Sequence, residues 1–139
     1  MDPFSLTAGS IGILGPVLQV CFKVKTLISD VREAPRELET TLHHIEELER
    51  TIRLIRDDNN ATTRELPRDI AKQMVNVVRN SQDILVKLHA LVDNYTPGTG
   101  RHFVSVKWVS SGKKEAIALN KQLEVHTRSL AMTVGISTL

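Results

Sequence analysis

The most constraining feature of this sequence is the spacing of its apolar residues, which recur every three or four positions over most of the chain. One series runs from Leu38 to Ile55, a second from Ile70 to Val92 and a third from Ala116 to Val134. This is the period of an amphipathic helix. The spacing predicts helices near 35–57, 67–94 and 113–134. The polar run 57–60 is expected to end the first of them, and Ser111-Gly112 is expected to form a break before the last. Apolar and polar residues alternate only over 102–109, which could be a brief strand or a helical turn. Because no other segment has the pattern of a strand, a parallel sheet or a sandwich is excluded.

The N-terminal region differs from the rest because twenty consecutive residues, Pro3 to Phe22, carry no charge. That length can cross a hydrocarbon core as a helix. Its nine large apolar residues favour insertion by roughly 3–5 kcal/mol together, a gain largely offset by glycines, Pro16 and polar residues. The positively charged start of a secretory signal peptide is missing. We therefore predict an apolar helix near 5–29 that is marginal for insertion. The residues expected to engage the membrane are Phe4, Leu6, Ile11, Ile13, Leu14, Val17, Leu18, Val20 and Phe22.

These segments together predict an all-α fold, an antiparallel bundle of four main helices with a short extra element and an apolar N-terminal helix. The 139 residues suit a single domain spanning 1–139. The near-balanced charge of +2 and the 4% aromatic content argue against nucleic acid as a partner. The residues expected in the core are Leu42, Ile45, Ile52, Ile84, Leu88, Leu123 and Leu130.

Charge is distributed unevenly along the chain. Residues 33–57 hold seven acidic and four basic residues, whereas residues 101–139 hold six basic and two acidic ones. Such asymmetry can steer a partner or favour self-association. The alternative is that two solvated helix faces simply carry opposite charge.

No combination of residues indicates an active site. Gly9, Gly12 and Gly15 lack the strand and the Lys-Ser/Thr of a phosphate loop. The pair His43-His44 beside two glutamates lacks the i, i+4 histidine spacing of a zinc site, and we expect His126 to be a hydrogen-bonded core residue. The single cysteine, Cys21, lies in the most apolar segment, excludes an intramolecular disulfide and fits a reducing compartment. We expect neither enzymatic activity nor a cofactor or metal.

Basic residues beside aromatic ones provide the second candidate site. Lys23 and Lys25 follow the uncharged stretch, and Lys107, Trp108, Lys113 and Lys114 form a basic segment near the C-terminal helix. A tryptophan among lysines suits a lipid interface or a groove on a partner. Alternatively, Trp108 anchors a loop onto the bundle and the lysines around it are solvated.

Two end motifs carry a resemblance to a known family. They are Met1-Asp2-Pro3-Phe4-Ser5-Leu6-Thr7-Ala8 and the series Lys107-Trp108, Lys113-Lys114-Glu115, Leu119, Leu123-Glu124, His126 and Leu130-Ala131-Met132. Together they resemble the HeLo-like N-terminal domain of fungal NOD-like receptors and related signalling proteins.

The resemblance implies a membrane-targeting, cell-death-inducing or signalling bundle at the N-terminus of a larger protein. Its partners would be membrane lipid, anionic by preference, further copies of itself and receptor or effector modules that follow it. It would be cytoplasmic and move to the plasma membrane on activation. The leading hypothesis is that residues 3–22 are held against the bundle and engage the membrane on oligomerisation. The alternative is an adaptor that self-associates or docks a partner helix without meeting lipid.

Overall fold

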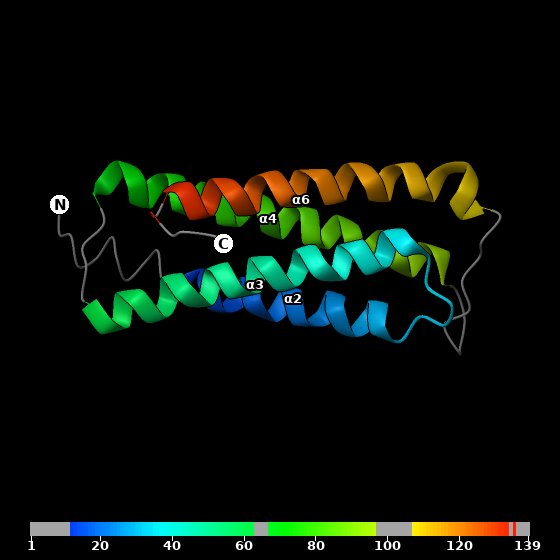
Figure 1. Cartoon of the computed structure of the whole chain (residues 1–139), viewed down its shortest axis with the longest axis horizontal. Coiled ribbons are helices and arrows are strands. Elements are labelled where there is room, and N and C mark those ends of the chain that lie inside the picture. Colours follow the sequence, from blue (N-terminus) through cyan, green and yellow to red (C-terminus); the bar gives the residue numbers. More distant parts are fainter. Residues whose placement is uncertain (1–11, 63–66, 97–106, 134, 136–139) are drawn as a thin grey trace.

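Four long helices lie side by side along one axis in the computed structural model, which describes residues 12–62, 67–96, 107–133 and 135 (Figure 1). They are α2 (Leu14–Ser29), α3 (Arg36–Thr62), α4 (Arg68–Tyr95) and α6 (Lys113–Thr133). A five-residue π-helix, η1 (Trp108–Gly112), leads directly into α6. No strand forms within the described ranges. The prediction of an all-α bundle is therefore confirmed.

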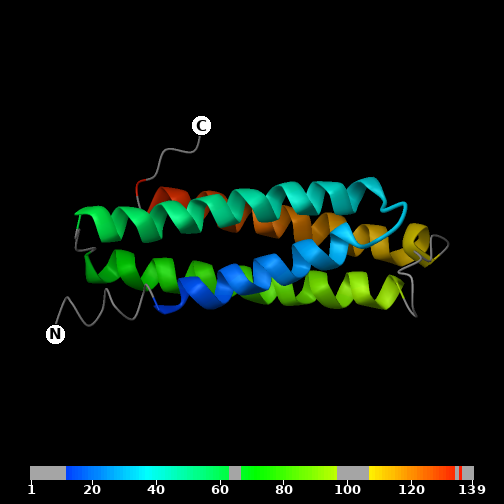
Figure 2. The same cartoon turned by 90° about the horizontal axis from the view of Figure 1, so that it is seen from below.

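The helices form two layers, with α2 and α3 in one and α4 and α6 in the other (Figure 1). Helix α2 packs on α3 and α4, and α6 packs on the same two helices. The consecutive helices α3 and α4 therefore occupy a diagonal of the bundle. Figure 2 shows that each long helix runs along the axis opposite to the one before it. The beginning of α2 and the end of α6 thus lie toward the same end of the molecule.

Prolines mark the beginnings of three helices. Pro16 lies in the first turn of α2, where its missing N–H costs little, and the Val17 N–H reaches the Ile13 carbonyl at 3.5 Å. Pro35 and Pro67 immediately precede α3 and α4, and their carbonyls accept hydrogen bonds from residues in the first helical turns. The start predicted for the first helix, near residue 5, lies outside the described residues.

One predicted helix end and one predicted break are wrong, whereas the last helix begins at Lys113 as predicted. Helix α3 continues through the polar run 57–60 to Thr62, because helix propensity is a weak determinant beside the packing that buries Ile55 in the preceding turn. Ser111 and Gly112 do not break the helical backbone, since both belong to η1, which continues into α6. Of the ambiguous segment 102–109, the described part, Lys107–Val109, is helical.

Six of the seven predicted core residues are buried, and Leu42 is the exception. Leu42 is half-buried and packs against the core from its edge. Thr41 occupies the inward position instead, because its hydroxyl can donate to Asn120 Oδ1 of α6 at 2.6 Å and lies 2.8 Å from the Glu37 carbonyl. A buried polar side chain with partners on both sides thus replaces the expected leucine.

Candidate functional site

The inner face of α2 is part of the hydrophobic core. Leu14 and Val17, both expected to engage the membrane, are buried, as are Cys21 and Val24. Ile13, Leu18 and Val20 are half-buried and pack against the core. The described part of the predicted membrane-engaging segment is thus held mainly against the bundle. Phe4, Leu6 and Ile11, which belong to the same prediction, lie outside the described residues.

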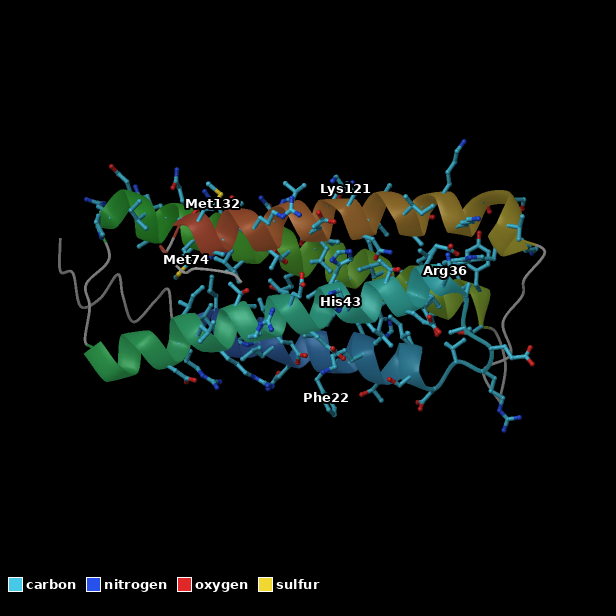
Figure 3. All side chains as sticks on the ribbon, viewed as in Figure 1. Phe22, Arg36, His43, Met74, Lys121 and Met132 are labelled. Carbon is cyan, nitrogen blue, oxygen red and sulfur yellow. The ribbon has the colours of Figure 1, made fainter. Side chains whose placement is uncertain are left out.

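Phe22 is the member of this set that faces outward. Its side chain is 65% exposed, and it points away from the other helices on the outer side of α2 (Figure 3). Lys23 beside it is exposed as well. An exposed aromatic ring next to an ammonium group is typical of a surface that meets a lipid headgroup region.

A groove runs between this part of α2 and the second half of α3, and we refer to it as the α2–α3 groove. It has a volume of about 550 Å³. Its lining residues are Gly15, Leu18, Gln19, Phe22 and Lys23 from α2 and Arg53 and Arg56 from α3. The lining carries three cationic side chains and no acidic one. Phe22 and Lys23 were predicted from the sequence, whereas Arg53 and Arg56 were not, because only the packing of α2 on α3 brings the two segments together.

A partly buried ion pair joins α2 to α3 beside this groove. Lys25 Nζ lies 2.7 Å from Glu49 Oε1, and the Glu49 side chain is only 7% exposed. Arg53 Nη2 lies farther from the same carboxylate, at 3.8 Å. Lys25, which we expected at an interface, is therefore engaged within the bundle. Because a buried carboxylate without its cation is strongly destabilised, this pair helps to hold α2 in place.

Cys21 faces the core close to that ion pair. Burial and, to a smaller extent, the negative charge of Glu49 raise the pKa of its thiol from 9.0 to about 12, against smaller opposing effects of Lys25 and Arg53. The thiol therefore stays protonated near neutral pH, and a buried neutral thiol is unreactive.

The second candidate site has a different environment. Trp108 is 2% exposed, and its Nε1–H donates to Glu37 Oε1 of α3 at 3.0 Å. Its ring meets Tyr95 edge-to-face, with centroids 5.4 Å apart. Glu37, Tyr95, Trp108, Gly112 and Asn120 form what we call the Trp108 cluster. Lys107, Lys113 and Lys114 are exposed around it. The structure thus favours the alternative in which Trp108 anchors its segment onto the bundle.

The π-helix lets the backbone approach these rings. The Lys113 N–H donates to the Trp108 carbonyl, five residues earlier, which widens this turn. A Cβ on Gly112 would lie 2.6 Å from Trp108 Cε3 and 2.8 Å from Tyr95 Cζ, so the site requires glycine. Ser111 Oγ, 2.6 Å from the Tyr95 hydroxyl, fixes the same turn from its exposed side.

Two of the described histidines lie in one pocket. His43 and His44 line a pocket between α3 and α6 with Glu47, Arg50, Glu124 and Arg128. His43 lies 3.3 Å from Glu47, and Arg128 pairs with Glu124 at 2.9 Å. Across the described ranges, no group of three or more His, Cys, Asp or Glu side chains is placed to hold a metal ion. His126 is half-buried, and its Nδ1 lies 2.7 Å from the Gln122 carbonyl.

Within the part of the chain that the structure describes, no helix has both the length and the hydropathy needed to cross a bilayer. Comparison of the chain with protein-family models, with curated proteins and with solved structures produced no match. The α2–α3 groove and the outer side of α2 are therefore the surface on which we base a functional proposal.

Proposed function

We propose that this domain is a non-enzymatic, membrane-targeting effector of the cell-death-inducing or signalling kind, and that its N-terminal apolar region engages the membrane on oligomerisation. The observation that carries the proposal is the exposed Phe22 ring between Lys23 and the arginines of the α2–α3 groove. An aromatic side chain gains from entering the headgroup region, and the surrounding cations are attracted to anionic lipid.

The resting bundle restrains α2, so engagement beyond the outer face requires a trigger. Withdrawing Leu14 and Val17 from the core exposes two buried side chains, at about 1.5–3 kcal/mol each, and the Lys25–Glu49 pair opposes the same movement. Contact between several copies at one membrane supplies the compensating energy in this proposal. The domain would then be cytoplasmic at rest and move to the plasma membrane on activation, under the control of modules that follow it in a longer chain.

An adaptor function is the second candidate, and the outer surface of α6 favours it. Ile117, Val125 and Met132 are exposed there, and Met132 is the most exposed of the large apolar side chains described, at 81%. Lys121 and Arg128 flank them. This surface, which lies in the other layer of the bundle from Phe22 (Figure 3), fits a partner helix or a second copy without any contact with lipid.

Binding to vesicles tests the proposal. The variant is Phe22→Asp, and its matched control is Val86→Asp, which changes a 54% exposed apolar residue on α4. We expect the parent and Val86→Asp to co-sediment with anionic vesicles and Phe22→Asp to remain in solution, with unchanged thermal melts for all three. Dye leakage from the same vesicles, with the domain oligomerised through a fused multimeric tag, separates the two functions. Failure of the oligomerised parent to bind vesicles would refute the membrane proposal and favour the adaptor.

A further inference from the structure

Two grooves of this bundle differ in their balance of charge. The pocket between α3 and α6 is lined by the acidic Glu47 and Glu124 as well as by cationic side chains, and Glu124 pairs with Arg128 at 2.9 Å. The α2–α3 groove has cations from both helices and no acidic lining residue. Its lining therefore carries a net positive charge, with Glu49 and Asp57 outside the lining at 3.8 Å from Arg53 and 3.7 Å from Arg56.

Among the described side chains, Glu49 and Asp57 are the carboxylates that lie within 4 Å of the arginines of the groove. Glu49 lies 2.7 Å from Lys25 but 3.8 Å from Arg53, which is too far for a hydrogen bond to the guanidinium. Asp57 lies 3.7 Å from Arg56 Nε. Both guanidinium groups are partly exposed, and each carries five N–H donors in a planar arrangement that suits phosphate oxygens.

The α2 wall of the groove carries two apolar side chains beside Gln19 and Lys23. Leu18 is half-buried and Phe22 is exposed, and both lie on the α2 side. A Cβ added at Gly15 would meet nothing within 4 Å, so this end of the groove is open. A free phosphate ion would use the arginines but gain nothing from this wall. A ligand that joins a phosphate to hydrocarbon uses both.

We propose that the α2–α3 groove binds the phosphate headgroup of one anionic glycerophospholipid. Arg53 and Arg56 hold the phosphate oxygens, Lys23 adds charge at the rim, and the glycerol and the start of the acyl chains lie against Leu18 and Phe22. This assignment deepens the proposed membrane function and rests on it for the source of the lipid. It also places the lipid directly on the helix whose release the membrane function requires.

A soluble lipid tests the groove separately from the membrane. The full chain is titrated with dihexanoyl phosphatidate below its micelle concentration, and the arginine side-chain N–H signals are followed by NMR. We compare Arg53→Gln/Arg56→Gln with Lys113→Gln/Lys114→Gln, which removes the same charge from an exposed site on α6. The first pair should weaken binding about twenty-five-fold, roughly fivefold for each guanidinium, and the second less than about twofold. Thermal melts verify that both variants are folded.

Each outcome has one meaning. Equal weakening by the two pairs would show general electrostatic attraction and overturn the groove. Inorganic phosphate that binds as tightly as dihexanoyl phosphatidate would overturn the lipid assignment in favour of free phosphate. Groove binding of the soluble lipid without association of the chain with phosphatidate vesicles would keep the groove and remove the membrane function. Vesicle association that is unaffected by the arginine substitutions would keep the membrane function and overturn the lipid site in the groove.

Discussion

Two aromatic side chains with a lysine next to them in the sequence have opposite environments in this bundle. Phe22, followed by Lys23, is 65% exposed, whereas Trp108, preceded by Lys107, is 2% exposed. The polar Nε1–H of Trp108 finds Glu37, and Gly112 leaves room for its ring. Phe22 lies on the side of α2 opposite to the core face formed by Leu14, Val17 and Cys21.

The difference shows that an aromatic–lysine pair does not identify a lipid-facing surface by itself. The decisive factor is whether the fold supplies a partner for the ring. Trp108 receives an edge-to-face ring and a carboxylate from two other helices. Among the described residues no comparable cluster encloses Phe22, and three of the seven residues that line its groove are cationic.

Removing the buried ring has the largest effect. Trp108→Ala should lower the free energy of unfolding by about 3–5 kcal/mol, because it leaves a cavity and an unpaired Glu37 carboxylate. Chemical denaturation followed by circular dichroism measures the loss. A loss no larger than that of Phe22→Ala would contradict the anchoring role of Trp108.

Adding a methyl group at the π-helix should have the next largest effect. Gly112→Ala places a Cβ 2.6 Å from Trp108 Cε3 and should cost about 1–3 kcal/mol, although alanine is the better helix former. The matched control is Gly12→Ala, whose Cβ would meet nothing within 4 Å, and we expect a change within about 0.5 kcal/mol. If both variants have the same urea midpoint of unfolding as the parent, the rings of Trp108 and Tyr95 do not lie as close to Gly112 as described.

The residue before Phe22 sharpens the contrast within α2 itself. The folded state keeps the Cys21 thiol protonated above its unfolded pKa of 9.0, up to about 12. Between these values the folded state binds more protons than the unfolded state, so stability must fall as the pH rises, by up to roughly 1.4 kcal/mol for each pH unit. Cys21→Val should remove this part of the slope. Parallel slopes for the parent and the variant above pH 9 would mean that Cys21 is not buried.

Truncating the exposed ring should have the smallest effect on stability. Phe22→Ala is expected to change the free energy of unfolding by less than about 0.5 kcal/mol, because the ring is mainly in contact with solvent. A thermal melt beside the parent checks this expectation. A drop as large as that for Trp108→Ala would show that Phe22 is a core residue and would remove it from the functional surface.

Local periodicity was sufficient to predict much of the fold. Ile45, Leu88 and Leu123 face the core as their spacing requires, since a helix repeats every 3.6 residues whatever lies around it. The prediction that Leu42 is buried was wrong because Thr41 takes the inward position, with a hydrogen-bond partner in Asn120, 79 residues away along the chain. No helix period carries information about a hydrogen bond over that separation.

The candidate sites were harder to predict for the same reason. The burial of Trp108 depends on Glu37, 71 residues earlier, and the groove depends on the pairing of α2 with α3. A usable signal did exist for the arginines. Arg53 and Arg56 recur at helical spacing on the polar side of α3, but only the packed structure places them beside Phe22.

The most direct test of the central proposal is to ask which face of the bundle enters the lipid environment. In a Cys21→Ser background, single cysteines at Phe22→Cys and Val86→Cys are labelled with an NBD fluorophore, and anionic vesicles are added. We predict a blue-shifted, stronger emission at position 22 and no change at position 86, because the outer face of α2 meets the headgroups while α4 stays in water. A response at position 86 equal to or larger than that at position 22 would contradict the assignment of this face.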